Sequence, residues 1–166
     1  MDMLRPGMTV IAVLFAAGAV LAAPLDTAHD MMDALTRADA WAVMDLLSAD
    51  VRARVDAALE GLKELARQSP AAASDLLRST GLGIGPDQLA GMTSEELLDL
   101  VLRRRRPSFH FSEVEREHVT MSGRRAEVGL ALLGGDSLHM SMVWEEGAWK
   151  ISGSRLLDRA LAGFGR

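Results

Sequence analysis

Apolar residues in the first half of the chain recur at spacings of three and four, the period of an amphipathic helix. Asp26 or Thr27 can cap the first such helix. Its expected inward positions are Ala28, Met31, Met32, Leu35, Ala38, Trp41, Ala42 and Leu47. We therefore expect a helix that continues to about Leu47 and turns one apolar face toward the core.

Two more helices follow in the pattern. The second begins after Asp50 and stops at Ser69, because Pro70 disfavours the helical conformation for the residue before it. Residues 71–79 are rich in alanine and predict a short third helix. The glycines and the proline of residues 81–86 interrupt it, and this segment lacks the preceding strand and the Gly-Lys-Ser/Thr ending of a phosphate-binding loop. We interpret it as a linker.

A fourth helix begins at a T-x-x-E capping box formed by Thr93 and Glu96, and Pro107 ends it. The four arginines 103–106 lie at its C-terminal end, where the helix dipole favours cations. They are typical of a solvated helix end, and an alternative is that they grip an anionic group or an acidic partner surface.

After Pro107 the apolar period changes from 3.6 to two, which predicts strands. Hairpin signals separate them at 122–123, 134–136 and 146–147. The expected strands are residues 109–121, 125–133, 137–145 and 148–152, followed by a terminal helix over 155–161.

The first strand has an irregular pattern. Alternation along the strand places acidic residues on the same face as apolar ones: Glu113, Glu115 and Glu117 with Phe109 and Val119. We therefore expect either a β-bulge in this strand or a face that is partly wet.

Helices first and a strand meander second predict an α+β fold, with N-terminal helices packed on one side of a curved antiparallel sheet of four or more strands. The chain shows no internal repeat. Residues 23–166 are expected to form a single domain.

The N-terminus has the pattern of a secretory signal at residues 1–22. Met8 to Leu21 is an uninterrupted, mainly apolar run, too short to span a bilayer comfortably. Val20 and Ala22 supply the small residues that signal peptidase prefers, so cleavage is expected before Ala23. The predicted location is periplasmic or secreted, and an uncleaved anchor is the alternative. No further membrane association is expected once the signal is removed.

Composition narrows the chemistry. The chain has no cysteine, which excludes disulfides, thiolate metal sites and a cysteine nucleophile. Its net charge of −5 argues against a nucleic-acid partner.

The first and last predicted hairpins resemble the nuclear-transport-factor-2-like (NTF2-like) superfamily, whose cone-shaped α+β fold is also called cystatin-like. Residues 143–151 (VWEEGAWKI) are similar to the family ending apolar–x–acidic–x–Gly–x–Trp–x–Ile. Residues 118–128 (HVTMSGRRAEV) are similar to the hairpin that precedes it, and an amphipathic first helix carrying Trp41 fits the family. Gly147 would serve the turn, and Trp149 and Ile151 the core.

The resemblance implies a pocket between the concave sheet and the helices. In some family members this pocket is the active site of an isomerase or a dehydratase, in others it binds a small ligand, and others make only protein contacts. Residues 71–106 are a helical insertion relative to the shortest family pattern, and they would cover the pocket as a lid or fill it. Dimerisation through the sheet is common among relatives, so a homodimer is an open alternative. The candidate lining residues are Trp41, Phe109, His110, Phe111, His139, Met142 and Trp144.

The candidate acid–base residues are His110 and His139, because both lie on strands that could reach such a cavity. The chain has no tyrosine, so a phenolic oxyanion donor of the ketosteroid-isomerase type is missing. A lyase or isomerase without a cofactor is therefore an alternative function. It would need a histidine within hydrogen-bond reach of a carboxylate inside an open cavity.

Methionines next to histidines raise a second alternative, a periplasmic copper protein. The pairs are His29-x-Met31, His118-x-x-Met121 and His139-Met-Ser-Met142. Copper binding would require at least three of these side chains to converge, whereas Met31, Met32, Met140 and Met142 fall on core-facing positions. No metal or cofactor site is assigned on this pattern.

The sequence therefore favours an exported, non-enzymatic binding or accessory module that holds a small apolar ligand or docks a protein partner. A cavity packed solid by Met and Leu would favour an interaction role.

Overall fold

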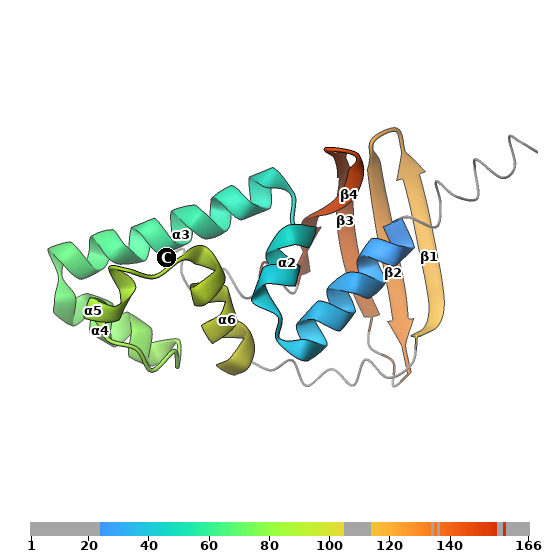
Figure 1. Ribbon diagram of the computed structural model, residues 1–166. Helices are drawn as coiled ribbons and strands as arrows, with labels where there is room; N and C mark the ends of the chain where they lie inside the picture. Colours follow the sequence, from blue (N-terminus) through green and yellow to red (C-terminus); the bar gives the residue numbers. More distant parts are fainter. Residues whose placement is uncertain (1–23, 105–113, 134, 136, 156–157, 159–166) are drawn as a thin grey trace, which may run out of the picture.

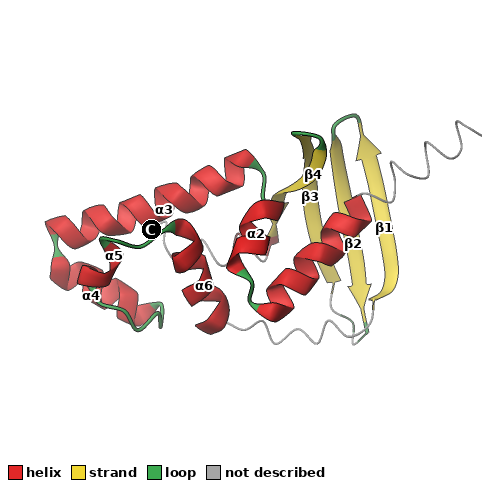
Figure 2. Cartoon of the chain, viewed as in Figure 1, coloured by secondary structure: helices red, strands yellow, loops and turns green. Residues whose placement is uncertain are grey.

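The computed structural model describes residues 24–104, 114–133, 135, 137–155 and 158. The described chain consists of helices followed by a four-stranded antiparallel sheet, which confirms the predicted α+β class. Figure 1 shows the sheet at one end of an elongated molecule, with a group of helices extending from it. Figure 2 shows the clear separation of helical and strand regions along the chain.

The expected first helix is in fact two helices. The first covers residues 24–37, and α2 covers Ala40–Leu46. The break lies at Ala38, which has a φ of 53°, and at Asp39, whose carboxylate accepts a hydrogen bond from the Ala42 backbone at 3.0 Å and so caps α2. This break changes the phase between the two apolar faces.

The break explains why one inward prediction was wrong. Trp41 is 57% exposed, whereas Ala40, Val43 and Met44 are the buried residues of α2. The helix through residues 24–37 meets the expectation, because Ala28, Met31, Met32 and Leu35 are all buried on its sheet-facing side.

The long helix α3 covers Ala49–Gln68 and begins at Ser48, whose hydroxyl accepts a hydrogen bond from the Val51 backbone. Ser48 is itself buried and donates its backbone N–H to the carbonyl of Ile151 at 2.9 Å. The start of α3 is therefore fixed to the sheet, and the helix leads away from it (Figure 1).

The segment 71–106 forms three helices as far as it is described. These are α4 (Pro70–Ser79), the short α5 (Pro86–Leu89) and α6 (Ser94–Arg104). The capping box of α6 is confirmed, since Glu96 accepts from the Thr93 backbone at 2.8 Å and Thr93 accepts from the Glu96 backbone at 3.3 Å. The α5 turn was not predicted, because residues 81–86 were interpreted as the start of a plain linker.

The sheet is a meander in the order β1-β2-β3-β4. The strands are β1 (Val114–Ser122), β2 (Arg125–Leu132), β3 (Ser137–Glu145) and β4 (Ala148–Ser154). The bulge expected in the first strand is present between Val114 and Arg116. It lets both Val114 and Glu117 face the helices, because one residue between them has no partner on β2. Residues 109–113, predicted as part of β1, lie outside the described residues.

Two apolar clusters hold the described chain together. The larger one joins the sheet to the N-terminal helix, α2, the start of α3 and one side of α6. The smaller one joins the far half of α3 to α4, α5 and the other side of α6. Because α3 and α6 contribute to both, they connect the sheet end of the molecule to its helical end.

Candidate functional site

The sheet face toward the helices is filled by the chain's own side chains. Every inward residue from Ala126 to Leu132 on β2 and from Leu138 to Met142 on β3 is buried. Met31, Met32 and Leu35 of the N-terminal helix belong to the same cluster. On β2, and on β3 as far as Met142, this face therefore consists of packed Met, Leu, Val and Ala.

Three of the predicted lining residues lie in the described part of α2 and β3. Met142 is 1% exposed inside the cluster. Trp144 lies farther along β3 on the same side, 36% exposed, with its ring centroid 5.4 Å from that of Trp149 in an edge-to-face arrangement. Trp41 lies on the outward side of α2.

The remaining predicted residues are placed differently. His139 is exposed and alternates with the buried Leu138 and Met140, so it lies on the sheet face away from the helices. His139 and Met142 therefore lie on opposite faces. Phe109, His110 and Phe111 lie outside the described residues.

One histidine in the described ranges does form an ion pair with a carboxylate. His29 Nε2 of the N-terminal helix lies 2.9 Å from Glu117 Oε1 on the helix-facing side of β1. Both side chains are substantially exposed, at 46% and 37%. This surface pair does not have the enclosed setting that acid–base catalysis requires. The irregular parity of Glu117 in the sequence was the available signal for it.

The described members of the arginine run are used within the fold. Arg103 Nε donates to Asp99 at 2.8 Å along α6. Arg104 donates to the backbone carbonyl of Gly81 at 3.0 Å and covers Gly83. These two cations therefore hold the glycine-rich segment and the end of α6, whereas Arg105 and Arg106 lie outside the described residues.

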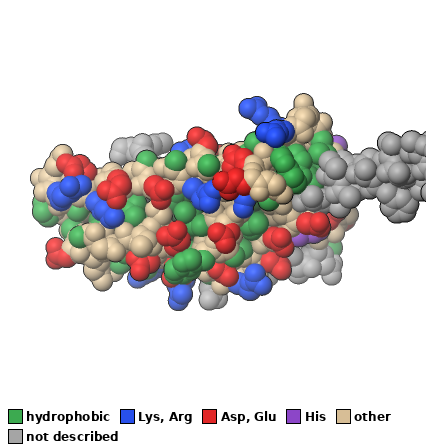
Figure 3. All heavy atoms as spheres, turned by 45° about the horizontal axis from the view of Figure 1, so that its top comes forward, with side chains coloured by type: hydrophobic (Ala, Val, Ile, Leu, Met, Phe, Trp, Pro, Cys, Tyr) green, Lys and Arg blue, Asp and Glu red, His purple; other side chains and the backbone are tan. Residues whose placement is uncertain are grey.

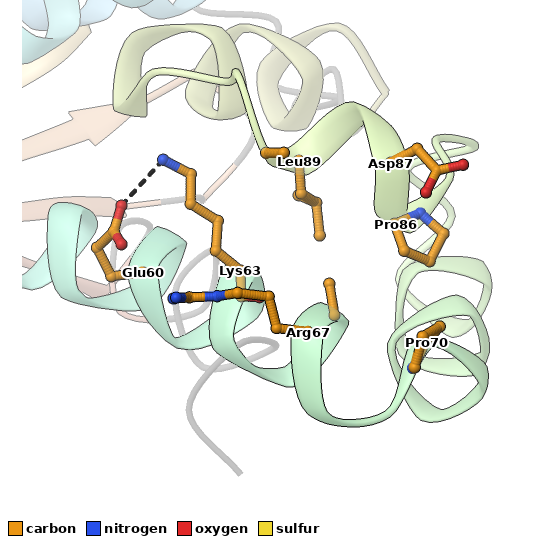
Figure 4. Close-up of a pocket in the computed structure, with 9 residues that line it drawn as sticks. Glu60, Lys63, Arg67, Pro70, Pro86, Asp87 and Leu89 are labelled. Atoms are coloured by element: carbon orange, nitrogen blue, oxygen red, sulfur yellow. Dashed lines mark hydrogen bonds and ion pairs between the residues drawn. The ribbon is translucent and has the colours of Figure 1, made fainter.

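A half-open groove of about 500 Å³ lies between α3, the start of α4 and α5 (Figure 4). Lys63 and Arg67 line it from α3, with Glu60 pairing to Lys63 at 2.9 Å and Arg67 pairing to Glu64 at 2.8 Å. Leu89, which is buried in the smaller apolar cluster, forms part of the groove wall, and Figure 4 shows Pro70 and Pro86 at one end of the groove. This groove was not predicted from the sequence, although the spacing of Glu60, Lys63 and Arg67 places all three on one side of a helix.

Two of the three histidine–methionine groups of the copper hypothesis are divided between the two faces of the sheet, and the third, His29 and Met31, lies on the N-terminal helix. Met121, Met140 and Met142 face the helices, whereas His118 and His139 face the other way. Among the described residues, no group of three or more His, Asp and Glu side chains is placed to hold a metal ion.

Acidic and basic side chains are interspersed along the helical part of the molecule in Figure 3, so the face in view carries no large area of one sign. Within the part of the chain that the structure describes, no helix has the length and apolar character needed to cross a membrane.

Comparison of the chain with family models, with curated proteins and with solved structures finds no match in any of the three.

Proposed function

We propose that this chain is an exported, non-enzymatic accessory module of NTF2-like architecture that docks a protein partner. The order of helices and strands, and the ending VWEEGAWKI at residues 143–151, support the architecture. The predicted signal at residues 1–22 supports export.

The observation that carries the docking role is the filled helix-facing side of the sheet. The inward residues Val128, Leu130, Met140 and Met142 are each 1% exposed, and the N-terminal helix packs directly on their cluster. A ligand in this region would have to displace buried apolar side chains, and interiors packed at normal density do not yield such space without a large free-energy penalty. The packed side chains between the sheet and the helices therefore favour recognition of a partner at the outer surface over binding of a ligand in the interior.

The groove between α3 and α5 supports the same choice. Pockets for small apolar ligands are lined mainly by hydrophobic side chains. This groove presents Lys63, Arg67, Glu60 and Asp87 beside its apolar residues and is open to solvent. Such a mixed lining suits a protein surface better than an apolar small molecule.

The proposed contact residues are Trp41 and Trp144. Tryptophan is enriched among the residues that dominate binding energy at protein interfaces. An indole that is 57% exposed on α2, and a second that is 36% exposed on β3, offer apolar area that the described fold leaves uncovered.

Site-specific photo-crosslinking in the native host tests this proposal. A benzophenone amino acid is placed at Trp41, at Trp144 and, as a matched control, at exposed Ala72 on α4. We expect one discrete protein adduct from position 41 or 144, and none from position 72. Equal labelling at all three positions, or no adduct at any of them, would contradict docking through the indoles.

Native mass spectrometry of the protein purified from its host separates partner docking from ligand binding. We expect a chain that begins at Ala23 and carries no small-molecule adduct. Extra mass that disappears on denaturation would instead support a bound ligand, and a mass that retains residues 1–22 would contradict signal cleavage.

A further inference from the structure

The sheet face away from the helices brings two histidines together across three strands. His118 on β1 pairs with Gly129 on β2, and Gly129 pairs with His139 on β3. Cross-strand partners point to the same side of a sheet, so the two imidazoles flank a position that has no side chain. Both histidines are exposed.

The imidazole of His139 leans over this glycine. A methyl group placed on Gly129 would lie 3.5 Å from Nδ1 and Cε1 of His139 and 4.0 Å from Cβ of His118. The His139 imidazole therefore lies over Gly129, and the Cβ of His118 lies on the other side of the same glycine. A glycine in the middle of a central strand often marks a point where another group approaches the backbone closely.

The next row of the same face supplies oxygen atoms. Thr120 pairs with Glu127, and Glu127 pairs with Ser141. The Thr120 hydroxyl lies 3.0 Å from Nε2 of His118, and the Ser141 hydroxyl donates to Glu127 at 3.0 Å. Hydrogen bonds of this kind orient imidazole and carboxylate ligands in metal sites.

We propose that His118 and His139 bind one divalent transition-metal ion, of the copper, nickel or zinc class, over Gly129. Imidazole nitrogen is a preferred ligand for these ions, at a metal–nitrogen distance of about 2 Å. The site uses nitrogen and oxygen donors, because the methionines of these strands face the helices. It is an open two-imidazole site, consistent with the absence of a three-ligand group among the described residues.

The rigid part of the site is the backbone. The pairing of β1, β2 and β3 fixes the positions of both histidines, so only side-chain torsions have to change when the ion binds. Gly129 has no side chain, which leaves room beside Nδ1 of His139 for an ion bound to that nitrogen.

This arrangement gives a variant that keeps both ligands and blocks the ion. In Gly129→Ala the added methyl makes only ordinary contacts at 3.5 Å and 4.0 Å, so the fold is expected to accept it. The methyl would nevertheless lie 3.5 Å from Nδ1 of His139 and would crowd an ion bound to that nitrogen. His29→Ala is the matched control, because His29 is also exposed but lies on the N-terminal helix and pairs with Glu117.

The experiment is calorimetric titration of the full mature chain with Cu²⁺, Ni²⁺ and Zn²⁺ in a non-chelating buffer, with electron paramagnetic resonance of the Cu²⁺ form. We expect one equivalent of metal, and for Cu²⁺ the spectral signature of two imidazole nitrogens. Loss of an orienting partner alone weakens metal binding by about 10- to 100-fold. We therefore expect His118→Ala, His139→Ala and Gly129→Ala each to weaken it by at least about tenfold, with His29→Ala unchanged.

Circular dichroism of each variant checks that the sheet is intact. Unchanged affinity in folded His118→Ala or His139→Ala would overturn the proposal. So would unchanged affinity in Gly129→Ala, because the imidazole of His139 would then only cover the glycine. Failure of the unmodified chain to bind any of the three ions more tightly than the double variant His118→Ala/His139→Ala would also overturn it.

Discussion

Arg104 illustrates how one side chain at a helix end can organise a distant segment. Its guanidinium donates to the Gly81 carbonyl and lies directly over Gly83. Gly83 has a φ of +65°, a left-handed conformation that residues with a Cβ adopt only at a cost. The glycine therefore provides both the backbone turn and the room for the arginine.

We expect Gly83→Ala to destabilise the protein more than Gly81→Ala. Both positions have a positive φ, which costs a non-glycine residue about 1–2 kcal/mol. At Gly81 an added methyl meets nothing within 4 Å, whereas at Gly83 it would lie 2.5 Å from Arg104 Nη2. Displacing the arginine loses its hydrogen bond to Gly81, worth about 0.5–1.5 kcal/mol more. Urea denaturation measures the difference.

Gly61→Ala is the control for this pair. Gly61 lies in the interior of α3 with open space around its Cα. Alanine is favoured over glycine there by about 0.5–1 kcal/mol, so the unfolding midpoint should rise. Equal midpoints for Gly81→Ala and Gly83→Ala would show that Arg104 adds nothing at this site.

At the scale of elements, two serines lie before helices and act differently. Ser48 caps α3 with its side chain, and its backbone bonds to Ile151 of β4. Ser69 lies before α4 but makes no side-chain capping bond, and Pro70 follows it. Both positions have a serine directly before a helix, but only the Ser48 side chain accepts a capping hydrogen bond.

We expect Ser48→Ala to lower the free energy of unfolding by about 1 kcal/mol, the usual value of a helix N-cap. Ser69→Ala is expected to change it by less than about 0.5 kcal/mol, because no capping bond is lost. Parallel urea denaturation of the two variants measures both values. A larger loss from Ser69→Ala than from Ser48→Ala would contradict the assignment of the caps.

At the scale of the whole molecule, the two apolar clusters share α3 and α6. Val51 and Val55 of α3 belong to the sheet cluster, and Leu59 and Leu62 belong to the helical cluster. Loss of either cluster therefore removes packing from helices that the other one needs. This continuity favours unfolding as one cooperative unit.

We expect tryptophan fluorescence and helical circular dichroism to give coincident thermal transitions. The three tryptophans belong to α2, β3 and β4, so fluorescence reports the sheet end, whereas the dichroism is dominated by α3 and the helices after it. Leu77→Ala in the helical cluster should cost about 2–5 kcal/mol and lower both midpoints. A midpoint that falls only in the dichroism would show that the helical end unfolds separately.

Several features of this protein follow from the sequence alone. The change of period after Pro107, the capping box at Thr93 and Glu96, and the hairpin at Ser122-Gly123 correctly predicted helices followed by an antiparallel meander. These are local signals, because they depend on residues within a few positions of one another. The shared parity of Glu117 and Val119 indicated a bulge or a partly wet face in β1. The structure has both, a bulge between Val114 and Arg116 and an exposed Glu117 on the helix-facing side.

Other features were decided by the tertiary structure. The left-handed Ala38 changed the helical phase and exposed Trp41, whereas Trp149 and Ile151 are buried as the resemblance of the last hairpin implied. His118 and His139 were identified from the sequence, but only strand pairing aligned them with Gly129 on one face. Local periodicity specifies which residues share a face within an element. It does not specify the phase across a break or the partner on the next strand, because those depend on contacts between residues far apart in the chain.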